Sequence, residues 1–465
     1  MPPLNDPCRP AYHFTPPAHW INDPNGLIHH KGWYHVFYQH NPGEDGWGDI
    51  HWGHARSRDL LQWEHLPIAL APSKEECGEQ HCFSGCCAIN GKGEPVIFYT
   101  MIFGEPREVP SWTGYAMGSA DLLRWQKFPR DPVMKTDVHG DTRISEWRDP
   151  FVFQFQNRTF MVQGGTRVGK DSRGVVLLYE AMDNDLLRWS YRGVIFEHPQ
   201  ADLRSIECPV FFPIAADRFI LILSPYGPVQ YWTGTFDPDV PRFNPEVSGV
   251  VDHGKNYYAA NVFRDGLGRW LSLAWVNGFK ERSGNGWCGC LSLPRVLECG
   301  TDGRLLQKPA PELRDLRRRH VRRDGGRIQG RLEITELTSD MLEVEAVVQL
   351  GTCDSLSVAF VEANSQNARL ELKIAGDRVF LNGDEIPNAP LLGANLIELR
   401  IFADRSVFEI FINETFCCTR TLHESPTAYF FRLEADSAGA VLERLDLWEL
   451  APLTYSSEFE LASQK

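Results

Sequence analysis

The sequence predicts an all-β protein, with an N-terminal five-bladed β-propeller over residues 1–310 and a C-terminal antiparallel β-sandwich. Two observations carry this prediction. Short apolar segments recur in step through the first part of the chain, and segments that alternate apolar and polar residues follow. The chain also holds 39 glycines and 31 prolines, which suit many short strands joined by turns. Its 465 residues are too many for one core and predict two or three domains.

Two features repeat along the predicted propeller. The pentapeptide Asp-Leu-Leu-x-Trp recurs at intervals of 62 and 64 residues, beginning at Asp59, Asp121 and Asp185. A polar residue that precedes an apolar strand, a turn and a second apolar strand recurs at intervals of 61, 65, 58 and 51 residues, at Asp23, Ser84, Asp149, Glu207 and Tyr258. Four short strands per unit, repeated about five times, are typical of a propeller. Because a repeated feature is usually architectural, the tryptophans of the pentapeptide are expected to pack between blades: Trp63, Trp125 and Trp189.

Three acids occupy equivalent positions in this register: Asp23, Asp149 and Glu207. Equivalent positions on innermost strands surround one axis, so the three side chains are expected to converge at one end of the central channel. The alternative is that each is a turn residue, and "NDPNG" at 22–26 taken alone favours a turn. Like charges are costly to hold together, so their convergence would indicate a function.

The composition excludes several classes of protein. A net charge of −14 argues against nucleic acid and anionic membrane surfaces as partners. No apolar stretch reaches membrane-spanning length, and the N-terminus lacks a signal-peptide pattern, so we expect a cytoplasmic protein, or a secreted one if a signal has been removed. The cysteine-rich stretch at 77–87 has no clean CxxC pair, and buried reduced thiols are expected there instead of a metal site.

The second domain begins after a basic run. Residues 311–325 are predicted to form a solvated linker helix, residues 326–455 the sandwich, and residues 456–465 a tail. Period-two alternation in "LEVEAVVQL" (342–350) and "LIELRIFADRSVFEIFIN" (396–413) supports antiparallel strands. No catalytic triad, metal set or phosphate loop is evident in this domain.

Six blocks of sequence resemble the signature blocks of glycoside hydrolase family 32, the family of invertases, fructanases and related β-fructosidases. They are "WINDPNG" (20–26), "FSG" (83–85), "WRDP" (147–150), "IECP" (206–209), "GWCGCLSLPR" (286–295) and "ADRSVFEIFINE" (403–414). The blocks occur in the family's order and cover nearly the whole chain. Two residues depart from the common pattern. Ile21 stands where methionine is common, and Ile206, where many invertases have tryptophan, puts the preferred substrate in question.

The resemblance implies a role for each matched position. Asp23 matches the nucleophile, Glu207 the general acid/base, and Asp149 the stabiliser of the transition state, which binds fructose hydroxyls. Positions that match the lining of the fructose pocket are Asn22, Gln39, Trp47, Phe83, Ser84, Arg148, Cys208, Tyr258 and Trp287. The three aromatic residues Trp47, Phe83 and Trp287 are expected to form walls against the sugar instead of core.

These residue types suit the chemistry. Cleavage of a fructosidic bond builds positive charge on the fructose ring, and two carboxyl groups suffice for a retaining displacement. Asp23 must be ionised to attack, and Glu207 must start protonated. Hydrogen bonds from Asn22, or from backbone amides of the turn, are expected to keep Asp23 charged. No metal or organic cofactor is needed.

The function predicted from the sequence is a retaining β-fructofuranosidase that acts on sucrose and short fructans through a covalent fructosyl-enzyme. Its partner is a small fructoside, and it is a monomer or homodimer. Three alternatives stay open: a fructosyltransferase with the same residues, a sucrose-phosphate hydrolase, which would need a basic subsite, and a catalytically silent sugar-binding propeller.

Overall fold

The structure is a computed structural model, which describes residues 6–104, 110–279, 284–365, 367–391, 394–423 and 428–457. Within these ranges the chain forms two compact units. The propeller unit takes residues 15–251, 257–306 and 454–457, and the sandwich unit takes residues 6–14, 252–256 and 307–453.

Five separate sheets contain the described strands of the propeller unit. Sheet one has the order β19-β1-β2-β3-β4-β33, formed by Trp287–Cys288, His19–His30, Trp33–Asn41, His51–Ser57, Gln62–Leu70 and Thr454–Ser457. Sheet two has the order β5-β6-β7-β8, formed by His81–Ile89, Pro95–Ile102, Trp112–Gly118 and Trp125–Lys127. Sheet three has the order β12-β11-β10-β9, formed by Trp189–Glu197, Arg173–Ala181, Arg158–Arg167 and Ile144–Phe155.

The remaining two sheets follow the same plan. Sheet four has the order β13-β14-β15-β16, formed by Glu207–Ala215, Arg218–Ser224, Gln230–Asp237 and Arg242–Val250. Sheet five has the order β17-β18-β21-β22, formed by Tyr258–Arg264, Trp270–Val276, Arg295–Cys299 and Leu305–Pro309, and β20 (Cys290–Leu291) pairs with β18.

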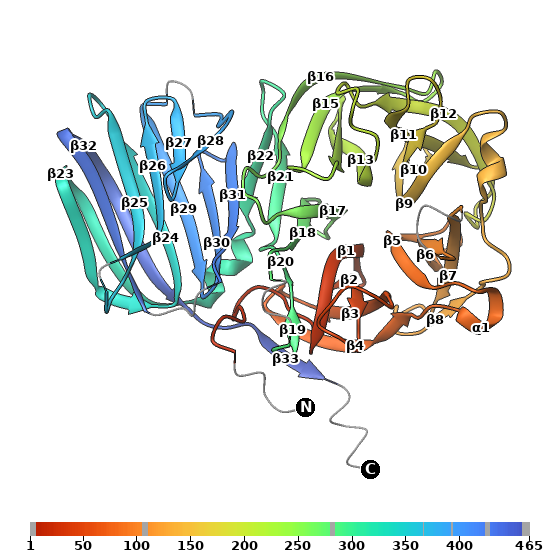
Figure 1. The fold of residues 1–465 in the computed structure, drawn as a ribbon, viewed down its shortest axis with the longest axis horizontal. Helices are drawn as coiled ribbons and strands as arrows, with labels where there is room; N and C mark the ends of the chain where they lie inside the picture. Colours follow the sequence, from red (N-terminus) through yellow and green to blue (C-terminus); the bar gives the residue numbers. More distant parts are fainter. Residues whose placement is uncertain are drawn as a thin grey trace, which may run out of the picture. The chain divides into compact units, whose positions relative to one another are not determined.

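The first strands of the sheets form a closed ring. β1 contacts β5, β5 contacts β9, β9 contacts β13, β13 contacts β17, and β17 returns to β1. Figure 1 shows these five strands around the middle of the unit, with the later strands of each sheet further out. This is the arrangement of a β-propeller, in which the residues of the first strands line the axis.

Each first strand carries a bulge at the position of the polar repeat. The pairing of first and second strands shifts register between Ile21 and Pro24, between Phe83 and Gly85, and between Glu207 and Val210. In sheet three the register of β10 against β9 shifts between Val162 and Gly164, which places the irregularity at Asp149 of β9. In sheet five the shift lies between Tyr258 and Asn261. A bulge bends the strand and re-aims a side chain, and such bulges are frequent beside active sites. The repeat seen in the sequence is therefore a repeat of bulges.

The pentapeptide repeats form the turn between the third and fourth strands. In each copy the tryptophan Nε1 donates to the carbonyl oxygen of the first leucine, as Trp63 does to Leu60 at 3.0 Å. Trp125 then packs edge-on against Phe37 of sheet one, with ring centroids 5.6 Å apart. Trp189 packs in the same way against Phe98 of sheet two, at 5.7 Å. The predicted packing between blades is confirmed for these two tryptophans.

The ten strands of the sandwich unit form one antiparallel sheet that folds around a second hydrophobic core. Its order is β28-β27-β26-β25-β32-β24-β29-β30-β31, and β23 pairs with β32. In chain order the strands are Arg317–Ser339 (β23), Met341–Gln349 (β24), Ser355–Glu362 (β25), Ala368–Ala375 (β26), Arg378–Leu381 (β27), Asp384–Ile386 (β28), Leu396–Asp404 (β29), Val407–Ile412 (β30), Phe416–Thr421 (β31) and Tyr429–Leu450 (β32). The core is aliphatic with a few aromatic rings, and each large buried side chain contributes about 1.5–3 kcal/mol. The predicted all-β class, with a propeller and a C-terminal sandwich, is confirmed.

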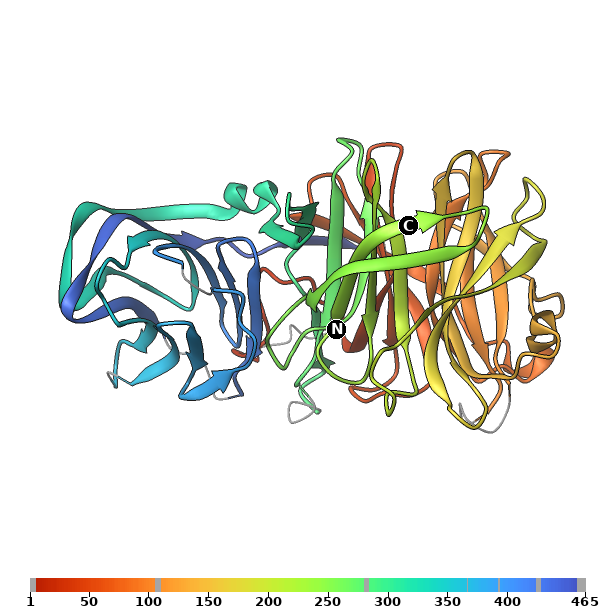
Figure 2. The same cartoon turned by 90° about the horizontal axis from the view of Figure 1, so that it is seen from above.

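Two details of the second domain differ from the prediction. The helix expected over 311–325 ends at Leu316, because only the 3₁₀ helix η3 (Pro311–Leu316) is helical and the basic run lies in β23. Arginines on a strand can form ion pairs with acids on neighbouring strands. Arg317 contacts Glu343 of β24, and Arg319 contacts Glu449 of β32. Figure 2 shows β23 and β32 as the long teal and blue ribbons that bend around this unit. The predicted tail begins inside β33, and residues 458–465 lie outside the described residues.

Helices contribute little to the fold. Besides η3, the helices among the described residues are the four-residue α1 (Lys74–Cys77) and the four-residue 3₁₀ helix η1 (Thr136–His139). Among the described residues, no helix has the length and apolar character needed to cross a membrane.

Candidate active site

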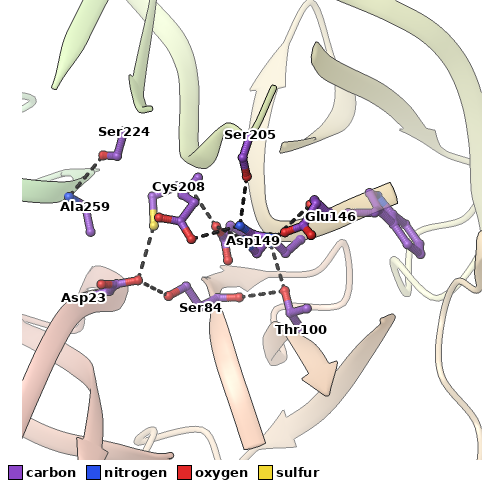
Figure 3. A network of polar contacts seen from close by, with 12 residues as sticks. Asp23, Ser84, Thr100, Glu146, Asp149, Ser205, Cys208, Ser224 and Ala259 are labelled. Carbon is purple, nitrogen blue, oxygen red and sulfur yellow. Dashed lines mark hydrogen bonds and ion pairs between the residues drawn. The ribbon is translucent and has the colours of Figure 1, made fainter. Parts of the chain in front are cut away.

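Four of the five first strands contribute to one closed ring of hydrogen bonds (Figure 3). Ser84 Oγ donates to Asp23 Oδ2 at 2.6 Å, and Thr100 Oγ1 donates to the carbonyl oxygen of Ser84 at 3.1 Å. The backbone N–H of Asp149 donates to Thr100 Oγ1 at 2.9 Å. Asp149 Oδ2 accepts from the backbone N–H of Cys208 at 2.8 Å, and Cys208 Sγ donates back to Asp23 Oδ2 at 3.4 Å. The ring brings the bulges of sheets one to four together.

Asp23 lies within strand β1 and not in a free turn, so the turn favoured by its pentapeptide is wrong. Asn22 Nδ2 donates to its Oδ1 at 3.0 Å, and Gln39 Nε2 approaches Oδ2 at 3.3 Å. Trp20 Nε1 holds the Asn22 amide by donating to its oxygen at 2.7 Å. The expected donor Asn22 is present, and the other donors are side chains instead of turn amides.

Burial outweighs these donors. It raises the pKa of Asp23 above its usual value, although the hydrogen bonds from Ser84, Asn22 and Cys208 oppose the shift and the charge of Glu207 adds to it. The donors therefore act in the expected direction, toward the charged form of Asp23, while burial acts against them.

Asp149 is more strongly affected because it lies deeper. Burial raises its pKa to about 7, against the positive charge of Arg148 and with repulsion from Glu207. The Arg148 Nε lies 4.0 Å from Asp149 Oδ2. A carboxyl group with a pKa of about 7 is partly protonated at neutral pH, so Asp149 can carry a proton there.

Glu207 begins strand β13, and its side chain stays partly open to solvent. Arg148 Nη2 donates to its Oε1 at 3.0 Å, and the Tyr226 hydroxyl donates to the same oxygen at 2.8 Å. The Tyr258 hydroxyl donates to Oε2 at 2.7 Å. Burial and the charge of Glu207 raise the pKa of Tyr258 well above its usual value, so this hydroxyl keeps its proton.

The bulges hold three residues in the left-handed region of the backbone, where side chains other than glycine are uncommon. The φ angles are 60° at Asp149, 47° at Cys208 and 52° at Ala259. Such conformations cost about 1–3 kcal/mol each and persist where the surroundings fix them. Here a hydroxyl of the preceding sheet fixes two of them, since Thr100 binds the N–H of Asp149 and Ser224 binds the N–H of Ala259 at 3.1 Å.

At the equivalent place before Glu207, sheet three has Gly164 instead of a hydroxyl residue. A Cβ added to Gly164 would lie 2.3 Å from the carbonyl oxygen of Ile206, so only glycine allows this close approach of two sheets. The Ile206 side chain is fully buried and lies against Gly164 and Gly174. This departure from the family pattern therefore fills core beside Glu207 and does not face the leaving-group side.

The structure brings most of the predicted pocket residues to this network: Asn22, Gln39, Ser84, Arg148, Cys208 and Tyr258. Trp47 and Phe83 lie beside it, with ring centroids 6.0 Å apart, and half of the Trp47 surface is exposed. Trp287 does not join them. Its side chain is fully buried in β19 and packs against Phe279, so its placement on the pocket wall is wrong.

Sequence reasoning missed three residues of the site. Tyr226 lies in the loop between β14 and β15, where no repeat points to it. Thr100 pairs with Phe83 and Ser224 pairs with Glu207, and this common position on the second strands opposite the bulges could have revealed them. The arrangement as a whole presents two carboxyl groups on different strands with a third beside them, which is the equipment for nucleophilic and acid–base catalysis at one bond.

Comparisons with known proteins agree with a site that carries catalytic carboxyl groups. Residues 13–309 match the family model "Glycosyl hydrolases family 32 N-terminal domain", and residues 312–449 match the corresponding C-terminal model. The chain is 30% identical to a sucrose-6-phosphate hydrolase of Zymomonas mobilis, over 88% of this chain and 85% of that one. It is 32% identical to a raffinose invertase of Escherichia coli, over 87% of each. Its fold is similar to a fructan 1-exohydrolase of Cichorium intybus in complex with 1-kestose, with a TM-score of 0.82 at 22% identity and coverage of 97% and 99%.

Proposed function

Because the chain belongs to glycoside hydrolase family 32 and is therefore a glycoside hydrolase, we propose that it is a retaining β-fructofuranosidase. Its proposed substrate is sucrose, with short fructans as further substrates. The observation that carries the proposal is the hydrogen-bonded ring that holds Asp23 beside Asp149 and Cys208. Glu207 directly precedes Cys208 in the sequence, so the third acid lies at the same site. A binding protein would need only polar contacts, whereas this site gathers three acids.

In the first proposed step Asp23 attacks the anomeric carbon of the fructosyl unit. The bond from that carbon to the glycosidic oxygen breaks, and the oxygen takes the proton of Glu207. Oδ1 is our candidate for the attacking atom, because among the described residues it accepts from Asn22 alone, whereas Oδ2 accepts from three side chains. The product of this step is an ester between fructose and Asp23.

In the second proposed step Glu207 removes a proton from water, and the resulting hydroxide displaces Asp23 from the anomeric carbon. Asp149 holds fructose hydroxyls through both steps, as the family resemblance implies. Arg148, Tyr226 and Tyr258 hold the Glu207 carboxylate in one orientation, so that the proton leaves and returns along one direction.

A second candidate substrate is sucrose 6-phosphate. Its support is the named activity of the Zymomonas mobilis relative. Against it stands the charge around Glu207: the only cation that bonds this carboxylate in the described part of the chain is Arg148, which also contacts Glu146 at 2.8 Å. An anionic leaving group would find a carboxylate there, so we favour the neutral substrate.

We also propose that the propeller has five blades, one for each sheet. The support is that every sheet carries the same bulge between its first and second strands. Sheets one and five depart from the four-strand pattern only by short additional strands. A density map that showed two of these sheets merged into one would contradict this.

The test is a product analysis on two substrates. The purified protein is incubated with sucrose and, separately, with sucrose 6-phosphate, and fructose and the glucose-containing product are quantified. We expect equal glucose and fructose from sucrose, and a lower kcat/KM for sucrose 6-phosphate. The reverse order of kcat/KM would establish the second candidate. Glucose in excess of fructose would indicate a fructosyltransferase, and no product from either sugar would contradict the proposal.

A further inference from the structure

A pocket of about 590 Å³ is lined by residues of the sandwich unit. Its wall is formed by the ends of β25 and β31, the start of β26, the residue after β27, and the segment 252–256. Prominent lining residues are Lys255, Asn256, Arg369, Asn382, Arg420 and Thr421.

The pocket is basic although the protein as a whole carries a net charge of −14. Lys255, Arg369 and Arg420 line it together with His423, whereas Glu362 is the one acid among its lining residues. Glu362 Oε1 lies 3.4 Å from Arg369 Nη1 and offsets part of one charge. In the described part of the chain Arg420 has no carboxylate partner, so its charge is available to a ligand.

Two buried polar atoms of the wall have no hydrogen-bond partner among the described residues. They are Arg420 Nε and Thr421 Oγ1. Thr421 is 4% exposed, and its backbone N–H donates to Asn256 Oδ1 at 3.0 Å, which fixes the residue in the wall. Buried polar atoms of this kind normally have a partner, so the wall of this basic pocket is unusual in leaving these two atoms unbonded within the described residues.

We propose that this pocket binds a small sugar phosphate. A guanidinium group offers a fork of N–H donors that matches phosphate oxygens, and the amide groups of Asn256 and Asn382 suit hydroxyl groups. No Phe, Tyr or Trp is among the lining residues that the structure describes, so the His423 imidazole is the one ring there that a nucleotide base could stack on. The site is independent of the proposed function, because its ligand need not be a fructoside.

The experiment measures binding of glucose 6-phosphate to the full-length protein by isothermal titration calorimetry at constant ionic strength. Inorganic phosphate, glucose and adenosine monophosphate serve as comparison probes. Arg420→Gln removes the available charge, and Arg420→Lys keeps the charge but removes the fork. Arg378→Gln is the matched control, because this exposed arginine of the same unit lies 3.9 Å from Glu385 and outside the pocket.

We expect glucose 6-phosphate to bind more tightly than any of the other three probes. Arg420→Gln should weaken binding about tenfold or more, Arg420→Lys should weaken it less, and Arg378→Gln should leave it unchanged. Sucrose hydrolysis should be the same in all three variants, and an unchanged thermal midpoint of Arg420→Lys excludes misfolding as the cause.

Four results would overturn the proposal. The first is no binding of glucose 6-phosphate to the wild type at millimolar concentration, and the second is equal binding of inorganic phosphate, which would indicate a bare anion site. The third is tighter binding of adenosine monophosphate. The fourth is binding that survives Arg420→Gln but is lost in Glu207→Gln, which would place the ligand at the catalytic acids.

Discussion

Buried carboxylates of the sandwich unit are matched by cations, whereas those of the propeller site are not. In the sandwich unit the fully buried Glu343 lies 2.7 Å from both Arg317 and Arg400. In the propeller site Arg148 contacts both Asp149 and Glu207, and Asp23 contacts no cation among the described residues. A buried charge with a partner avoids the high cost of an unpaired buried charge, whereas like charges held together raise the free energy of the fold. The difference supports the catalytic role proposed for the propeller acids.

The backbone shows the same contrast. Strands β24 and β29 pair over nine consecutive residues without a register shift, and β30 with β31 over six. The first two strands of every propeller sheet are interrupted by a bulge. Regular ladders satisfy every backbone group locally, whereas bulges need partners from a neighbouring sheet, such as the Thr100 hydroxyl. In this protein the irregular strands carry the site and the regular ones carry none of the proposed catalytic residues.

The largest expected effect is on turnover. Asp23→Asn and Glu207→Gln should each lower kcat on the fructoside substrate by about 10²–10⁴-fold or more, because each removes a group that forms or breaks a bond. Their unfolding midpoints should stay equal to or above that of the wild type, because a like charge is removed. Steady-state kinetics and thermal denaturation measure the two quantities. Glu197→Gln, an exposed change on β12, is the control and should alter neither. Substantial activity in either variant would refute its assigned role.

The second effect is on stability and belongs to the sandwich unit. Glu343→Gln should lower the free energy of unfolding by about 1–3 kcal/mol, because Arg317 and Arg400 lose their fully buried partner and keep only the less buried Glu345. The kcat of the folded fraction should be unchanged. Urea denaturation and active-site-normalised kinetics test this. If the variant kept its stability and lost its activity, the division between structural and chemical carboxylates would be wrong.

The smallest effect is a difference in pH dependence. The pKa of Asp149 rises from 3.8 to about 7 on folding, so the folded state holds a proton that the unfolded state releases. Stability should therefore fall as the pH rises from about 4 to 7, by at most roughly 4 kcal/mol, and Asp149→Asn should remove this loss. The measurement is the urea midpoint of both proteins at several pH values in this range.

A histidine of the sandwich unit, His13, is expected to affect stability in a different pH range. Although burial opposes its charge, hydrogen bonds from His13 to Asp404 and Glu409 raise its pKa from 6.5 to about 9. Its contribution is fully present below pH 6.5 and is lost as the pH rises through 9. His13→Gln should thus destabilise the protein by a constant amount up to pH 6.5 and by less at higher pH. If the stability of Asp149→Asn and of His13→Gln, each relative to the wild type, changed with pH in the same way, the separate pH ranges assigned to the two residues would be wrong.

The sequence predicted the polar residues of the site because a propeller repeats its first strand, and each repeat marks one bulge. It did not reveal that Asp23 belongs to a strand, because Asn-Asp-Pro-Asn-Gly has the residues of a turn and bulges use the same residues. The sequence did not predict Tyr226 as a site residue, because it lies in a loop outside the repeat. Trp287 was misplaced because its glycine neighbours suggest an open loop, whereas the strand pairing of β19 buries it.

Sheet one also has a consequence for the order of synthesis. Its edges are completed by β19 at residues 287–288 and by β33 at residues 454–457, which pairs in parallel with β4. As the chain leaves the ribosome, β4 therefore presents an open edge until the whole sandwich unit has been made. Open edges invite pairing with other chains. A nascent chain that stalls within the sandwich would expose this edge, because β33, the strand that covers it, follows the sandwich unit in the sequence.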